Sequence, residues 1–134
     1  MLPTGVLVAP MIPALNDPEL EAILEAARAA GAMAAGYVFL RLPHELKGLF
    51  EEWLDNHYPD RKSRVLKLIR EARGGRLYRP RFGARMSGTG VYANLLSDRF
   101  DKACRRLGLA DHLRALDNRQ FAPPPRAGDQ LSLL

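Results

Sequence analysis

Two short apolar runs separated by a helical segment constrain the fold of this 134-residue chain most strongly. The first, GVLVA at residues 5–9, is almost wholly apolar and ends at prolines, which favours a parallel-sheet strand buried on both faces. The second, AAGYVFL at residues 34–40, is rich in strand-forming residues. About two dozen residues separate them, enough for the right-handed crossover of a βαβ unit.

The segment between these runs carries the signals of an amphipathic helix. Asp17 is expected to be its N-cap, with Pro18 at the first helical position and Gly31 as its stop. Apolar residues recur at helical spacing and form one stripe: Leu20, Ile23, Leu24 and Ala27. The chain therefore reads as strand, helix, strand over its first third.

The remainder is predicted to be helical, with three further apolar stripes within residues 44–58, 60–73 and 91–107 and a proline-rich tail. Two parallel strands do not make a stable sheet by themselves. The sequence is therefore expected to describe the end of an α/β barrel or sheet. No apolar run is long enough for a membrane span, and a cytoplasmic location is the simplest interpretation.

Charge is distributed unevenly along the chain. Residues 1–60 carry three basic and nine acidic residues, whereas residues 61–106 carry fourteen basic and three acidic residues. Such a basic block favours a polyanionic partner, although a solvated helix face and a basic loop would give the same pattern. The single cysteine, Cys104, excludes an intrachain disulfide and a multi-cysteine metal site built by this chain alone.

Several blocks of the sequence resemble one known family. They are VAPMIPALNDPELEAILEAARAAGA, GYVFLRLPHELKGLFEEWL, HYPDR and FGARMSGTGVYANLL. Together they resemble the C-terminal part of radical SAM proteins of the spore photoproduct lyase-like, or DNA-repair-photolyase-like, group. The resemblance implies an α/β fold: residues 1–43 would be the last two strands and intervening helix of a partial TIM-like barrel. Residues 44–108 would be a basic helical extension and residues 109–134 a proline-containing tail.

The resemblance also implies cofactors that this chain does not carry alone. Members of the family bind S-adenosylmethionine (SAM) and a [4Fe–4S] cluster, held by three cysteines in a C-x-x-x-C-x-x-C loop. That motif and four barrel units are absent from this sequence. The chain is therefore expected to be a C-terminal fragment or one half of a split protein. It would contribute to the SAM and substrate pocket, be inactive by itself, and partner the missing N-terminal half.

The loop after the first strand holds the first candidate site residues. In barrels of parallel strands, chemistry lies at the carboxyl ends of the strands. Pro13 would hold the loop rigid, while Asn16 and Asp17 would approach the cofactor; the alternative is that Asp17 only caps the helix. At the end of the second strand, Arg41 could bind a carboxylate through two hydrogen bonds, or form a salt bridge to a neighbouring helix.

A second candidate site is the arginine- and glycine-rich segment at residues 76–90. Its basic and aromatic residues alternate: Arg76, Tyr78, Arg79, Arg81, Phe82 and Arg85. Arginines can contact phosphates while rings stack on unpaired bases, so the segment predicts a nucleic-acid-binding surface. The alternative is that these arginines pack against the acidic first half. A small basic nucleic-acid-binding module is accordingly the rival to the radical SAM interpretation.

Overall fold

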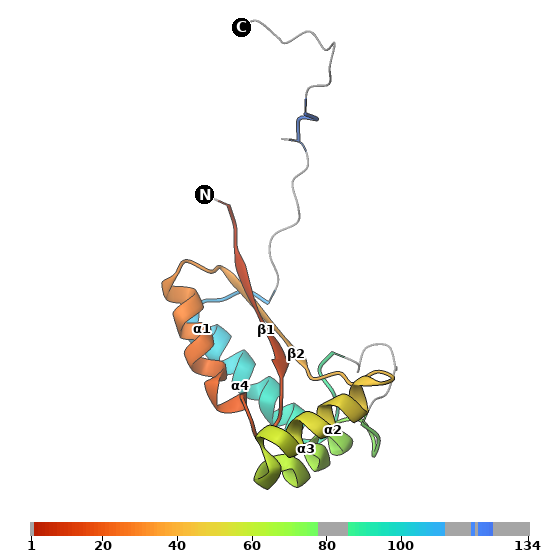
Figure 1. The fold of residues 1–134 in the computed structure, drawn as a ribbon. Coiled ribbons are helices and arrows are strands. Elements are labelled where there is room, and N and C mark those ends of the chain that lie inside the picture. Colours follow the sequence, from red (N-terminus) through yellow and green to blue (C-terminus); the bar gives the residue numbers. More distant parts are fainter. Residues whose placement is uncertain (1, 78–85, 112–118, 120, 125–134) are drawn as a thin grey trace, which may run out of the picture.

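The structure is a computed structural model, and it describes residues 2–77, 86–111, 119 and 121–124. Seven elements follow one another in these residues: strand β1 (Gly5–Met11), 3₁₀ helix η1 (Asp17–Glu19), helix α1 (Leu20–Ala29), strand β2 (Ala34–Phe39), and helices α2 (Leu46–His57), α3 (Pro59–Ala72) and α4 (Val91–Leu107). Figure 1 shows the arrangement, which is a small α/β fold without closure into a barrel among the described residues.

The two strands pair in parallel, as the βαβ pattern predicts. Their register runs from Gly5 opposite Ala34 to Val8 opposite Tyr37, and then shifts after Val8. At the far end, the Leu40 N–H donates to the Met11 carbonyl at 3.0 Å and holds the two strand ends together. The loops that follow the two strands therefore begin side by side, at the carboxyl end of the sheet.

One face of this sheet packs against α1 and α4. Val8 and Phe39 are buried on it, and α1 contributes the fully buried Leu24. From α4, the Phe100 ring lies 4.9 Å from the Tyr37 ring, between centroids. In Figure 1, α4 passes behind the strands and beside α1. This packing forms the main hydrophobic core.

The opposite face of the sheet is open among the described residues. Leu7 is 65% exposed there, and Ala9 is exposed as well. Gly36 lies opposite Leu7 in the register and leaves the face shallow. The expectation that the first strand is buried on both faces is therefore wrong for this structure, because the helices cover one side only.

The two edges of the sheet also differ. Beyond β2, the Ala35 N–H donates to the Ala110 carbonyl at 2.8 Å, and the Phe39 N–H donates to the Met86 carbonyl at 2.7 Å. Short non-strand segments thus occupy both ends of that edge. The outer edge of β1 has no paired strand in the part of the chain that the structure describes.

Helices α2 and α3 pack against each other near the carboxyl ends of the strands (Figure 1). Pro59 ends α2 and occupies the first turn of α3, where its missing N–H costs little. Helix α3 buries its apolar stripe, including Val65 and Ile69. Helix α4 ends at Gly108 in the left-handed conformation, as the sequence predicts. None of the described helices combines the length and apolarity that crossing a membrane requires.

Gly88 lies shortly before α4 and packs against Ala72 at the end of α3, so it provides a test of the packing between these helices. Its φ is +76°, and a Cβ there would lie 3.3 Å from both the Cβ and the carbonyl oxygen of Ala72. We expect Gly88→Ala to lower the free energy of unfolding by about 2 to 4 kcal/mol, from left-handed strain and crowding together. Urea unfolding followed by circular dichroism measures this loss.

Gly75→Ala is the matched control for that measurement. Gly75 has a similar φ of +88°, but no atom lies within 4 Å of the position that an added Cβ would take. The Gly75→Ala variant should lose only the part of its free energy of unfolding that comes from left-handed strain, about 1 kcal/mol. Equal losses for the two variants would contradict the close packing of Gly88 on Ala72.

Candidate functional site at the carboxyl ends of the strands

The loop after β1 is held together by the side chain of Asn16. Its Oδ1 accepts a hydrogen bond from the Ile12 N–H at 2.7 Å, and its Nδ2 donates to the Pro10 carbonyl at 2.9 Å. Pro13 is fully buried beneath this turn. The two predicted site residues Pro13 and Asn16 therefore shape the loop, and both groups of the Asn16 amide already have partners within it.

Asp17 does not cap the helix, and that prediction is wrong. A 3₁₀ turn precedes α1, Asn16 occupies the cap position, and no side chain makes a capping hydrogen bond there. Asp17 Oδ2 instead accepts a hydrogen bond from the Tyr92 hydroxyl at 2.8 Å. Burial and this carboxylate together raise the pKa of Tyr92 above its ordinary value. Asp17 thus links the loop to α4.

Arg99 of α4 completes this connection with a two-pronged ion pair. Its Nε and Nη2 donate to the two carboxylate oxygens of Glu21 at 2.8 and 2.7 Å, and Nη2 also donates to the Asp17 carbonyl at 2.8 Å. The hydrogen bonds from Arg99 lower the pKa of Glu21. Further along α4, Arg106 donates to Glu25 at 2.6 Å.

Arg41 follows β2 and is half-buried. Its Nη1 lies 3.6 Å from the Met86 sulfur, a weak acceptor. Its Nε is buried and has no hydrogen-bond partner among the described residues. The alternative, a salt bridge from Arg41 to a neighbouring helix, is not found within that part of the chain. The Arg41 guanidinium therefore keeps donors available for a carboxylate or phosphate.

Arg73 is a buried cation at the same strand end that sequence reasoning missed. It is 2% exposed, and its Nη2 donates to the carbonyls of Phe39 and Leu40 at 3.3 and 3.0 Å. Its guanidinium carbon lies 5.2 Å from the centre of the Phe39 ring. A signal was available: Arg73 continues the i, i+4 spacing of Val65 and Ile69, which places it on the apolar face of α3.

A cavity of about 310 Å³ lies between the loop after β1 and α3. Ala14, Asp17 and Pro18 line it from the loop, and Arg61 and Arg64 line it from α3. The two arginines were not singled out from the sequence, because only the fold brings α3 to this loop. Arg61 and Arg64 therefore bring positive charge to the carboxyl end of β1, where a barrel of parallel strands would bind ligands.

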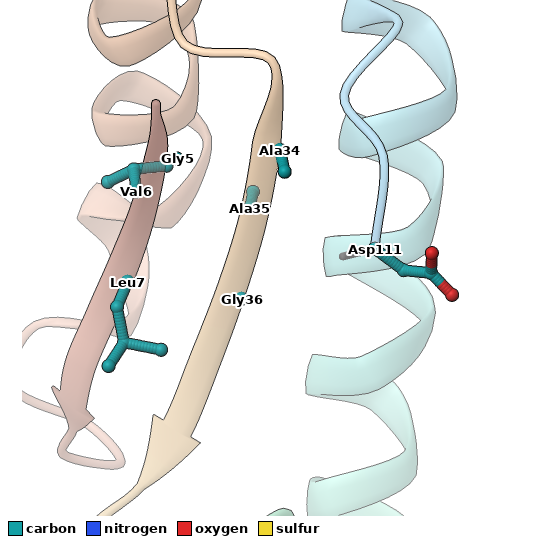
Figure 2. A pocket seen from close by; sticks show the side chains of 7 residues that line it. All are labelled: Gly5, Val6, Leu7, Ala34, Ala35, Gly36 and Asp111. Carbon is teal, nitrogen blue, oxygen red and sulfur yellow. The ribbon is translucent and has the colours of Figure 1, made fainter. Parts of the chain in front are cut away.

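The open face of the sheet carries a shallow apolar groove of about 270 Å³ (Figure 2). Its lining residues are Gly5, Val6, Leu7, Ala34, Ala35, Gly36 and Asp111. All except Asp111 come from the two strands, and four of them are glycine or alanine. The groove has almost no polar side chain that could fix a small ligand, which favours apolar packing there over specific ligand binding.

The predicted nucleic-acid-binding segment is described only in part. Arg76, at its start, is exposed. The other candidates lie outside the described residues: Tyr78, Arg79, Arg81, Phe82 and Arg85. Cys104 is buried in α4, and burial raises the pKa of its thiol. No group of three or more His, Cys, Asp or Glu side chains that could hold a metal ion occurs among the described residues.

Comparison of the chain with models of protein families, with curated proteins and with solved structures gave no match.

The ion pair between Glu21 and Arg99 predicts a pH dependence of stability. The folded-state pKa of Glu21 lies below its ordinary value of 4.5, so the pair stabilises the fold above that pH and the contribution is lost on acidification. At pH 7, Glu21→Gln should be less stable by up to about 1 kcal/mol, since both side chains are partly exposed. The difference from the unmodified chain should close below pH 4.5.

Arg99→Gln removes the same ion pair from α4 and serves as the companion variant. Thermal melts of the three proteins between pH 3 and pH 7 give the comparison. A stability difference for Glu21→Gln that stays constant across this range would show that the carboxylate charge is not what stabilises the contact.

Proposed function

We propose that this chain is the C-terminal part of a radical SAM protein of the spore photoproduct lyase-like kind. It would supply two strands, a share of the SAM and substrate pocket, and a helical extension, and would be inactive without the cluster-binding half. The observation that carries the proposal is the open face of the β1–β2 pair. Parallel sheets are ordinarily covered on both faces, whereas here α1 and α4 cover only one.

The side chains of the open face suit the interior of a barrel. They are uncharged, and the strand sequences GVLVAPM and AAGYVF contain no Lys, Arg, Asp or Glu. A solvent-facing edge strand would ordinarily be protected by charge or irregularity. Apart from Pro10 and the register shift after Val8, β1 carries no such protection. Its outer edge is therefore suited to pairing with further strands of the same sheet.

The outer edge of β2 supports the placement of β1 and β2 as the last two strands. Ala110 and Met86 occupy positions along the outer edge of β2. Additional strands would therefore be added beside β1. The remaining barrel strands would then precede β1 in the sheet, which agrees with β1 and β2 being the last two strands.

The residues at the strand ends fit a SAM or substrate carboxylate in part. Arg41 has donors available, and Arg61 and Arg64 add positive charge at the neighbouring cavity. Pro13 and Asn16 would shape the loop and Asp17 would anchor it to α4. The arginines would bind and orient the ligand. The Asn16 amide would not contact it, because its oxygen and nitrogen already bond to the Ile12 N–H and the Pro10 carbonyl.

The residues present do not fit a [4Fe–4S] cluster. Such a cluster needs several thiolates, and this chain has the single Cys104, which is buried with a raised pKa. The thiolates would have to come from a partner chain. This chain's contribution is confined to closing the sheet and lining the pocket.

Co-expression tests the proposal. The partner would be a chain encoded beside this one that carries a C-x-x-x-C-x-x-C loop and the first four barrel units. We expect the two to co-purify in equal amounts and, after supply of iron and sulfide, to bind SAM. Leu7→Asp should abolish co-purification, because it places a charge on the open face.

Two control variants make this result specific. Leu95→Asp places the same charge at a residue 55% exposed on α4 and should leave the complex intact. Arg41→Ala should keep the complex but weaken SAM binding about tenfold or more, as expected for loss of a charge-assisted hydrogen bond. Co-purification that survives Leu7→Asp would contradict an interface at the open face.

The rival function, a nucleic-acid-binding module, has one observation in its favour. Arg64, Lys67 and Arg70 are all exposed on α3. If they contact phosphates, binding to a single-stranded oligonucleotide should weaken steeply with salt. Changing Lys67 and Arg70 to Gln should reduce the slope of log affinity against log salt by about 1 to 2. Arg106→Gln, a cation already paired with Glu25, should leave it unchanged. No measurable binding in low salt would exclude this function.

A further inference from the structure

Helix α2 exposes a stripe of apolar side chains, which we call the α2 stripe: Leu46, Leu49 and Trp53. Their exposed fractions are 45%, 59% and 38%. The spacing i, i+3, i+7 places them on one side of the helix. Among the described residues, Leu54 is the only buried member of α2, and α3 is its main packing partner. The helix therefore buries only one edge of its apolar face, at Leu54, and leaves the α2 stripe exposed to solvent.

Aromatic rings hold the centre of the α2 stripe in place. The Trp53 ring stacks on Phe50 at 5.7 Å between centroids, and it also lies 5.2 Å from the Tyr58 ring and 5.5 Å from the His57 ring. A large ring fixed by its neighbours loses little conformational entropy when a partner binds. Exposed tryptophan of this kind is typical of binding hot spots.

One side of the α2 stripe is acidic. Glu45 and Glu52 lie at i−4 and i+3 from Leu49, so both flank the same side, and both are exposed to solvent. Neither forms an ion pair with another described residue. Like charges on a second copy of α2, or on an anionic membrane, would be repelled here, whereas basic side chains would be attracted.

We propose that the α2 stripe is a docking site for an amphipathic helix of a partner protein whose apolar side chains are flanked by Lys or Arg. Leu49 and Trp53 supply the apolar contact, and Glu45 and Glu52 select the charge and the orientation of the partner. Recognition of an amphipathic helix by i, i+3, i+4, i+7 contacts is a common binding mode. The inference does not rest on the proposed function, since α2 is separate from the open face of the sheet.

Trp53 is the only tryptophan in the chain, so its fluorescence reports on this surface directly. The probe is a synthetic helical peptide of about 18 residues, with Leu at i, i+3, i+4 and i+7 and Lys along both flanks. We expect a saturable blue shift of Trp53 emission at micromolar peptide. The same peptide with Glu in place of Lys should bind about tenfold more weakly, since a few surface ion pairs are lost and replaced by repulsion.

Variants of the full chain tie the binding to the α2 stripe. Leu49→Ser should abolish the shift while leaving the melting temperature unchanged, because the side chain is mostly exposed. Leu95→Ser removes a comparably exposed leucine from α4 and should leave binding unchanged. Changing both Glu45 and Glu52 to Lys should reverse the preference, so that the Glu-flanked peptide binds more tightly.

Several outcomes would overturn the proposal. Equal binding of the two peptides, or binding that survives Leu49→Ser, would mean that the surface does not select a basic helix. A dimer seen by sedimentation and abolished by Leu49→Ser would assign the stripe to a second copy. A blue shift with neutral phosphatidylcholine vesicles, abolished by Leu49→Ser, would assign it to a lipid surface.

Discussion

The packing of one face of a two-stranded parallel sheet against α1 and α4 is the constraint on which the rest of this structure depends. A pair of strands has too little surface to be stable alone. Phe39 and Leu24 are fully buried in this layer, and the Phe100 ring of α4 lies against Tyr37 of β2. Helix α4 is distant in sequence from the βαβ unit, yet it completes the unit's core.

Electrostatic contacts strengthen this layer and explain part of the uneven charge of the chain. The acidic first half and the basic second half meet where Arg99 binds Glu21 and Arg106 binds Glu25. Some of the basic residues that suggested a polyanionic partner are therefore engaged within the fold. The exposed cations of α3 and the exposed Arg76 are a different set, and among the described residues they support that suggestion.

The two exposed apolar surfaces described above differ in chemistry. The strand residues of the open face are uncharged, which suits further strands of the same sheet, and Asp111 is the one charged residue that lines its groove. The α2 stripe is aromatic and flanked by Glu45 and Glu52, which suits a basic helix. Arg41 and the arginines of α3 lie near the strand ends, so a partner that completes the sheet would also enclose this positively charged region.

Local pattern in the sequence was sufficient to predict both strands, the four α-helices and the stop at Gly108, because each depends on side-chain periodicity and on glycine or proline at the boundaries. It also located the loop after β1 and Arg41 at the strand ends. The sequence could not predict that Asp17 binds Tyr92 instead of capping its helix, or that the ring beside Arg73 is that of Phe39. Nor could it show that one face of the sheet is open. These features depend on which helix packs on which face, and only the tertiary structure decides contacts between residues so far apart in the chain.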